Sequence, residues 1–259
     1  MGTSGIIRNI IGIFVLGMIA GIGSGCSSYA TPGRGADFRA VGVTPEMQQN
    51  GTSPAMEEYL NKKPLAALPT GIAVARLQCS GYQSESTTSY GTGKYSIVTS
   101  RDVESDSAIE RLSKLKMVSG IAPLNRLMLP ANLNSDVELR NAAAQLHADM
   151  LLVYTIDTTF QKQDLGTPLP LFTLGLFPDE KLTCISTSSA VLIDTRNGYI
   201  YGLAEGTARN NKLSGFWGSK GAMDGARRQT ESESFEKLVG SIEKMWGGVV
   251  TRFDTTKAR

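Results

Sequence analysis

Residues 142–156, AAAQLHADMLLVYTI, decide the fold. The first half continues an apolar helical face that starts after Ser135, a good N-cap residue, and His147 stands where that helix ends. The second half, residues 150–156, is a nearly continuous apolar run, which is typical of a strand covered on both faces. A helix followed at once by a buried strand indicates an α/β domain.

The flanking segments predict the rest of a mixed β-sheet with helices packed on it. Strands are expected over 71–79, 95–99 and near 126–129, with a mobile loop over 80–92. Apolar residues recur every third position in 105–115, which favours a helix. Further on, two β-rich runs enclose Asn197-Gly198, the preferred pair for a type I′ turn, and predict a hairpin.

The chain ends in an amphipathic helix that is expected to start near Ser232 or Ser234. Its opposite face carries glutamates and lysines, so the helix should pack by one side on the domain's own sheet. The residues that form the apolar side are Phe235, Leu238, Val239, Ile242, Met245, Trp246 and Val249.

Residues 1–26, MGTSGIIRNIIGIFVLGMIAGIGSGC, have the layout of a secretory signal peptide, with one cation at Arg8. The apolar run spans residues 10–22, about 13 residues, whereas a membrane helix needs about 20. The small residues before Cys26 resemble the lipobox of bacterial lipoproteins, although Gly23 stands where an aliphatic residue is usual. This resemblance implies that Cys26 is acylated after cleavage. A plain cleaved signal and an uncleaved anchor are the alternatives.

The predicted organisation is a signal peptide over 1–25, a lipidated cysteine and flexible tether over 26–69, and one α/β domain over 70–259. The tether holds five prolines, with a short helix expected after Ser53. Ser27 follows the cysteine where aspartate would suggest inner-membrane retention, so the implied location is the outer membrane, facing the periplasm. The formal charge is only +2 and the charges are mixed, which gives nucleic-acid binding no support.

The order of elements, together with residues 142–156 and SAVLIDTRNGYIYG at 189–202, resembles a group of envelope lipoproteins. The group includes the curli-secretion lipoproteins, the amino-terminal domain of the Tol translocation protein and the activators of penicillin-binding proteins. These share a helix ending in Gly-Ala-Asp, a strand, and a hairpin of the type DxxTGxI. Here Ala148-Asp149 and residues 194–198 stand at the matching places, and His147 replaces the glycine. The resemblance covers about half of the chain and implies a fold rather than an activity.

The residues that could carry chemistry are few. Cys79 and Cys184 could form a disulfide in an oxidising compartment, or remain two buried thiols. His147 is the only histidine, and its place at a helix end indicates a structural role. Because no carboxylate pair, phosphate loop or metal-ligand set stands out, we expect no catalytic residue, no metal and no cofactor.

Residues 165–177, LGTPLPLFTLGLF, form an apolar, uncharged connection between two strands, where polar residues are usual. Such a segment must be covered by the domain's own core, by a partner or a second copy, or by lipid. The residues expected to make this contact are Leu169, Leu171, Phe172, Leu174, Leu176 and Phe177.

Together these observations favour a lipid-anchored, non-catalytic interaction module that acts on envelope proteins in assembly or regulation. One alternative is a subunit of an oligomeric outer-membrane export channel, in which the chain forms a homo-oligomer. Another alternative is a periplasmic hydrolase, which would need a deep polar cleft lined by acids of raised pKa.

Overall fold

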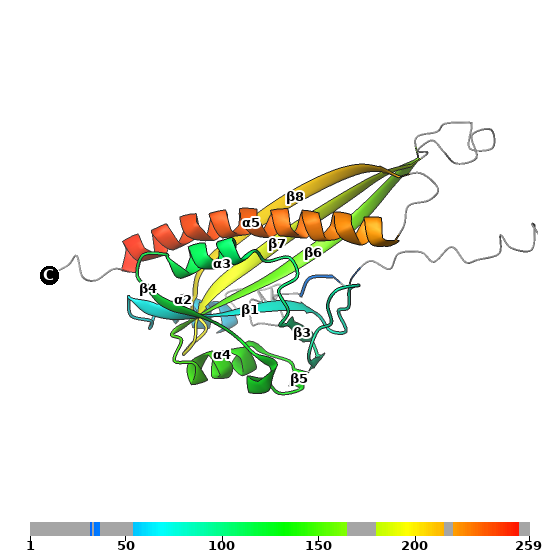
Figure 1. Cartoon of the computed structure of the whole chain (residues 1–259). Coiled ribbons are helices and arrows are strands. Elements are labelled where there is room, and N and C mark those ends of the chain that lie inside the picture. The colour runs from blue at the N-terminus through cyan, green and yellow to red at the C-terminus, as the bar shows by residue number, and fades with distance from the viewer. Residues whose placement is uncertain (1–31, 33, 37–53, 165–179, 215–219, 254–259) are drawn as a thin grey trace, which may run out of the picture. The chain divides into compact units, whose positions relative to one another are not determined.

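The structure is a computed structural model that describes residues 32, 34–36, 54–164, 180–214 and 220–253 (Figure 1). Contacts divide the chain into two units, Met1–Ala30 and Thr31–Arg259, and every described residue belongs to the second. Residues 1–25, which are predicted to form a signal peptide, Cys26 and the apolar segment 165–177 lie outside the described residues.

A mixed sheet with strand order β3-β1-β6-β7-β8 forms the centre of the second unit, and β4 also pairs with β1. Strand β1 is parallel to β4 and β6 and antiparallel to β3, whereas β6, β7 and β8 are antiparallel neighbours. A small second sheet joins β2 to β5. The strands are β1 (Thr70–Cys79), β2 (Thr92–Gly93), β3 (Tyr95–Val98), β4 (Val118–Pro123), β5 (Asn132–Leu133), β6 (Met150–Asp164), β7 (Glu180–Asp194) and β8 (Ile200–Ser214).

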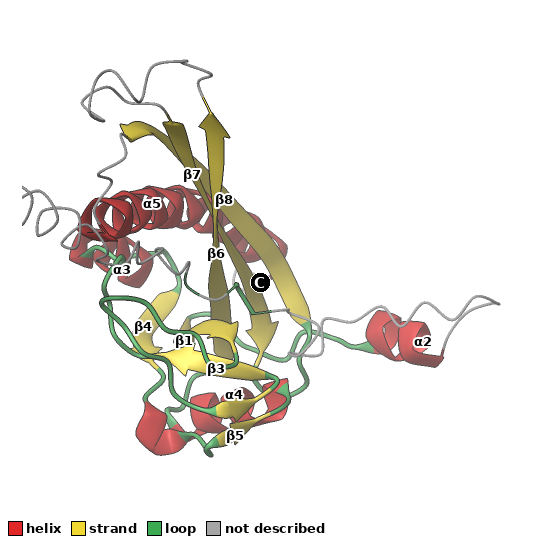
Figure 2. Cartoon of the chain, turned by 90° about the vertical axis from the view of Figure 1, so that its right-hand side faces the viewer, coloured by secondary structure: helices red, strands yellow, loops and turns green. Residues whose placement is uncertain are grey.

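Helices cover both faces of this sheet, with α4 on one side and α3 and α5 on the other (Figure 2). The predicted α/β class, a mixed sheet with helices packed on it, is therefore confirmed. The helices are α2 (Pro54–Asn61), α3 (Asp106–Ser113), the 3₁₀ helix η2 (Arg126–Met128), α4 (Asp136–Gln145) and α5 (Lys220–Phe253).

The apolar run at the start of β6 is buried on both faces because successive side chains of a strand point to opposite sides. Leu151 and Val153 belong to the core cluster under α4, whereas Met150, Leu152 and Ile156 belong to the cluster under α5. This explains why residues 150–156 show no alternation in sequence.

Helix α4 begins and ends as the sequence predicts. The backbone amide of Ser135 donates to Glu138 Oε2 at 3.0 Å, and the serine side chain accepts from the first turn, which completes a capping box. After the last turn His147 adopts a φ of 54°, the left-handed conformation that turns the chain into β6.

Two local predictions were wrong. Residues 126–129 form the short helix η2 rather than a strand, because the side chain of Asn125 caps the amide of Leu127, and the strand β4 lies earlier. The turn before β8 is not a two-residue type I′ turn but a four-residue loop closed by the amide of Asp194 and the carbonyl of Tyr199, and only Gly198 has a positive φ there. The connection 80–92 is hydrogen-bonded to β3 through Tyr90 and Ile97, and its Tyr82 is 3% exposed.

Strands β6, β7 and β8 are each 15 residues long and extend well past β1. Strand β1 pairs with β6 only over residues 72–75, and the two strands then diverge (Figure 1). The hydrogen-bonded body also includes parts of the stretch that we expected to be tether, because residues 34–36 bond to β1 and β6, and Leu65 and Ala66 bond to Asp194.

Helix α5 approaches β8 closely where the strand carries glycine. A Cβ atom on Gly206 would lie 2.3 Å from the backbone nitrogen of Leu238 and 2.6 Å from the carbonyl oxygen of Ser234. Beside it, the hydroxyls of Ser188 and Ser234 bond at 2.6 Å. Small residues on the strands therefore bring the helix backbone against the sheet.

We predict that Gly206→Ala lowers the free energy of unfolding by about 1–3 kcal/mol, because the methyl group must push the helix backbone away. The matched control is Gly240→Ala in α5, where an added Cβ meets nothing within 4 Å. That variant should gain up to about 1 kcal/mol from helix propensity. Urea unfolding of both variants checks this, and a stabilised Gly206→Ala variant would contradict the close approach.

Candidate functional site

Two buried arginines lie between α5 and the sheet. Arg76 on β1 is 2% exposed, and Arg227 on α5 is fully buried. The Nη1 atom of Arg76 donates to Asp102 Oδ1 at 2.9 Å and to Glu104 Oε1 at 3.2 Å. Its Nη2 atom lies 3.9 Å from Glu231 Oε2. A guanidinium on a strand is thus paired with carboxylates from a loop and from a helix.

Arg227 repeats this arrangement from the helix side. Its Nε atom donates to Asp224 Oδ1 at 3.0 Å and its Nη1 atom donates to Glu231 Oε2 at 2.6 Å. Its Nη2 atom donates to the hydroxyl of Ser86 at 3.2 Å. Glu231 is therefore shared by both arginines, which links α5 to β1.

Hydroxyl groups of the sheet complete this set. Tyr154 donates its hydroxyl to Glu104 at 2.8 Å, and Thr158 donates to Glu231 at 2.8 Å while contacting Ser186 at 2.9 Å. We call the set the buried ionic network. Its members are Arg76, Asp102, Glu104, Tyr154, Thr158, Asp224, Arg227 and Glu231.

The two shared acids of the network differ in electrostatics. For Asp102 burial alone would raise the pKa, but Arg76, a hydrogen bond from Ser86 and Arg227 outweigh it and leave the pKa below its usual value. For Glu231 burial dominates over the attraction of Arg227 and Arg76, so its pKa is raised. Glu231 is therefore the more easily protonated of the two.

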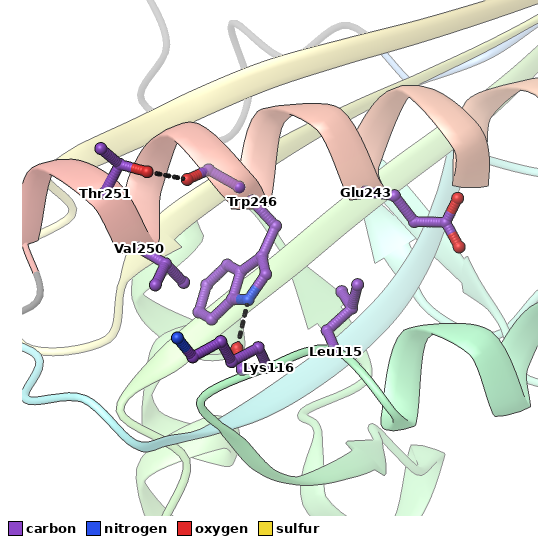
Figure 3. Close-up of a pocket in the computed structure, with 7 residues that line it drawn as sticks. Leu115, Lys116, Glu243, Trp246, Val250 and Thr251 are labelled. Atoms are coloured by element: carbon purple, nitrogen blue, oxygen red, sulfur yellow. Dashed lines mark hydrogen bonds between the residues drawn. The ribbon is translucent and has the colours of Figure 1, made fainter.

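A pocket of about 310 Å³ lies elsewhere, between the C-terminal half of α5 and the chain that follows α3 (Figure 3). The indole nitrogen of Trp246 donates to the carbonyl of Lys116 at 2.7 Å. Glu243 also lines this pocket, and its pKa is lowered, chiefly by its hydrogen bond with Arg111. The other lining residues are Leu115, Gly247, Val250 and Thr251.

Neither place has the arrangement that hydrolysis by carboxylates requires. The pocket's one lining acid is held ionised by Arg111, and the acid of raised pKa, Glu231, is 2% exposed and lines no part of this pocket. A general acid must reach its substrate, so a buried carboxyl bonded to two arginines is unsuited to that role. The buried ionic network instead fastens helix to sheet.

A second polar anchor holds the irregular segment before β1. The carboxylate of Asp194 is fully buried, and its Oδ2 atom accepts from the amides of Leu65 and Ala66 at 2.8 and 2.9 Å. The same oxygen accepts from the hydroxyl of Tyr201 at 2.8 Å, and Oδ1 accepts from the amide of Arg196. Asp194 thus fixes residues 65–66 to the hairpin.

The two cysteines that could have formed a disulfide are separate thiols. Strand β6 lies between β1, which carries Cys79, and β7, which carries Cys184. Two strand spacings of about 4.8 Å exceed the roughly 7 Å that a disulfide spans between Cα atoms. Cys79 Sγ donates to the carbonyl of Gly35 at 3.1 Å, and burial raises the pKa of the Cys184 thiol.

The other predicted site residues fall in two groups. Cys26 and the six apolar contact residues, Leu169, Leu171, Phe172, Leu174, Leu176 and Phe177, lie outside the described residues. His147 has the predicted place at a helix end. Within the described ranges, no group of three or more His, Cys, Asp or Glu side chains is arranged to hold a metal ion. None of the described helices combines the length and the apolar character needed to span a bilayer.

The buried ionic network was missed from the sequence, although one signal for it exists. In TGIAVARLQC, residues 70–79, Arg76 interrupts an otherwise apolar strand. Because an arginine in a buried strand must be paired, its presence predicts carboxylates nearby. The spacing of Asp224, Arg227 and Glu231 on one helix face is the complementary signal.

No protein-family model matches the sequence, and no curated protein matches it. Among solved structures, the chain is similar to a crystal structure described as that of a putative lipoprotein from Caulobacter crescentus CB15, with 11% sequence identity and a TM-score of 0.25. The match covers 45% of this chain and 82% of that chain. A likeness at this TM-score carries no argument about fold or function.

We predict that Arg227→Met lowers the free energy of unfolding by about 3–5 kcal/mol at pH 7, because it leaves Glu231 and Asp224 buried with less compensating charge. The loss should shrink at pH 4, where Glu231, whose pKa is raised, takes up a proton. The matched control is Arg228→Met, since Arg228 pairs with the same Asp224 but is half exposed. Urea unfolding should show a change within about 0.5 kcal/mol for the control. Equal effects of the two variants would contradict the network's role.

Proposed function

We propose that this protein is a lipoprotein, anchored through acyl chains on Cys26 to the outer membrane and facing the periplasm. Its body then acts as a non-catalytic module in envelope assembly or regulation, through protein contacts. The observation that carries this proposal is the arm formed by β6, β7 and β8, which extends past the core and is joined at its tip by the apolar segment 165–177. The segment follows Asp164, the last residue of β6, and precedes Glu180, the first residue of β7.

The proposal for the anchor rests on residues 1–26. A short apolar run behind a single cation, followed by small residues and a cysteine, is the pattern on which lipid attachment depends. Acyl chains contribute about 0.8 kcal/mol per buried methylene, so two or more chains hold a protein at a membrane durably.

The proposal for protein contacts rests on the outer part of the arm. Even-numbered residues of β6 and β7 there, such as Thr158 and Ser188, face α5, so odd-numbered residues face away from it. On that side Asp157 and Thr207 are exposed, and the hydroxyls of Thr187 and Thr207 bond at 3.0 Å. The outer arm is therefore a polar, hydrogen-bonded sheet rather than part of a core.

This arm has the geometry of a spacer. From Asp157 to Asp164 the strand rises by roughly 23 Å at about 3.3 Å per residue. All fifteen residues of β6 pair with β7, so the hydrogen-bonded ladder continues to Asp164, the last residue before the apolar connection. A rigid arm with an apolar tip is suited to reach a partner protein that a compact domain could not contact.

Oligomerisation into an export channel is the alternative use of this arm. Among the described strands β8 pairs only with β7, which leaves one edge for another chain. However, Lys237 donates to the carbonyl of Thr207 and Ser241 donates to the carbonyl of Glu205, both at 2.8 Å. Helix α5 thus occupies carbonyls of β8, which favours contacts through the tip. A ring seen by microscopy would support the channel, and a strict monomer in detergent would exclude it.

We predict that Cys26→Ser abolishes incorporation of an alkyne-labelled fatty acid, whereas Cys79→Ser leaves labelling unchanged. The physical reason is that the thioether-linked lipid needs the cysteine sulfur at the start of the mature chain. Mass spectrometry of the mature N-terminus checks the same point directly. A mature wild-type chain that starts at another residue, or carries no acyl mass, would contradict the anchor.

We predict that a photo-crosslinking amino acid at Phe172 gives, in cells, a defined adduct with another envelope protein. The matched control position is Leu203 on β8, which is 62% exposed but lies away from the tip. Leu171→Asp should remove the adduct, because a charge in an apolar contact is costly. Identification by mass spectrometry decides between outcomes: self-adducts would support the channel, and the absence of any protein adduct would contradict the proposal.

A further inference from the structure

Residues 34–36 occupy the opening between β1 and β6. Past Ala75 and Val153 these strands no longer pair, and Gly35 forms a bridge with Gln78 instead. The amide of Cys79 donates to the carbonyl of Arg34 at 3.1 Å, and the amide of Ala36 donates to the hydroxyl of Thr155 at 2.7 Å. We call residues 34–36 the docking segment, since they bond to both strands.

The fit of this segment is close. A Cβ atom on Gly35 would lie 2.8 Å from Thr155 Oγ1 and 3.4 Å from the Cβ of Asp157, so a larger side chain has no room. Ala36 is 8% exposed and belongs to the core cluster that contains Leu77 and Val153. The docking segment is therefore packed into the body at Gly35 and Ala36, whereas Arg34 is exposed.

We infer that the docking segment shortens the leash between the lipid and the body to residues 27–33, and so keeps this side of the body within about 29 Å of the lipid surface. The inference rests on the proposed acylation of Cys26. From Cys26 to Arg34 the chain can extend over roughly 29 Å at most, whereas from Cys26 to Pro54 it could extend over about 100 Å. A leash of the 27 residues 27–53 is thus reduced to the seven residues 27–33.

The rest of the expected tether cannot add to this reach. It is fixed at Ala36, whose amide donates to Thr155, and again at Leu65 and Ala66, whose amides donate to Asp194. A chain fastened at both ends is a loop of the body, whatever its length. Only the residues before Arg34 set the distance to the membrane.

This attachment also defines which side of the body meets the lipid. The docking segment contacts β6 at Thr155 and Asp157, and β6 continues for roughly 23 Å beyond Asp157 to its tip. That length is no greater than the reach of the leash. The tip of the arm is therefore within reach of the same membrane that holds the acyl chains.

The test uses the full-length, acylated protein in phosphatidylethanolamine and phosphatidylglycerol vesicles. A donor fluorophore on an unnatural amino acid at Gln161, an exposed residue of β6, reports its distance to acceptor-labelled lipid by energy transfer. One variant carries twenty Gly-Ser residues inserted after Ser28, and the matched control carries the same insert after Gln49. Where it lies in a free chain, the insert raises the r.m.s. end-to-end distance of the seven-residue leash from about 15 Å to about 29 Å.

We expect the insert after Ser28 to lower energy transfer about twofold and the insert after Gln49 to leave it unchanged. The Gly35→Val substitution should expel the docking segment. In that background the insert after Gln49 should lower the energy transfer as well. Equal effects of the two inserts in the wild-type background, or no effect of either, would overturn the inference. An unmodified Cys26 in the mass spectrum would instead overturn the proposed lipid anchor, and the short leash with it.

Discussion

The buried charge of Arg76 is the constraint on which the rest of the structure depends. A guanidinium that is 2% exposed must be matched by carboxylates, and Arg76 stands on β1 just where that strand leaves β6. Asp102 and Glu104 come from the loop before α3, and Glu231 comes from α5. Pairing one charge thus fixes a loop and a long helix against the sheet, next to the place where β1 and β6 stop pairing and the docking segment enters.

The two halves of α5 consequently pack on the sheet in different ways, one through apolar and the other through charged side chains. The C-terminal half packs through Phe235, Ile242 and Trp246 on the apolar core, whereas the N-terminal half faces the sheet through Arg227 and Glu231. Polar packing of this kind adds little net stability but specifies one arrangement of the partners. The polar packing of α5 supports β6, β7 and β8 where they extend past the core as an arm. Both proposed contacts, with lipid and with protein, lie along this arm.

The sequence predicted the elements whose burial is apolar and missed those whose burial is polar. Helix α4, the start of β6 and the hairpin follow from hydrophobic pattern and capping, and the structure confirms them. Strand β6 continues to Asp164, eight residues further than predicted, because its outer part, DTTFQKQD at 157–164, is mostly polar and lacks an apolar pattern. Helix α5 starts at Lys220 rather than near Ser232, because its first turns bury Arg227 instead of an apolar stripe. The buried ionic network joins residues far apart in the chain, so Arg76 in β1 and the charges of α5 indicate that pairing is needed but not which residues pair.

Native-state hydrogen exchange of the full chain tests most directly whether the docking segment stays bonded between β1 and β6, where these two strands diverge. The amides of Ala36 and Cys79 donate to Thr155 and Arg34 across the opening. The account predicts that both amides exchange as slowly as the core amide of Val153, because all three become exposed only when the whole domain unfolds. Exchange of Ala36 at the rate of an unfolded chain, with Val153 still protected, would contradict it.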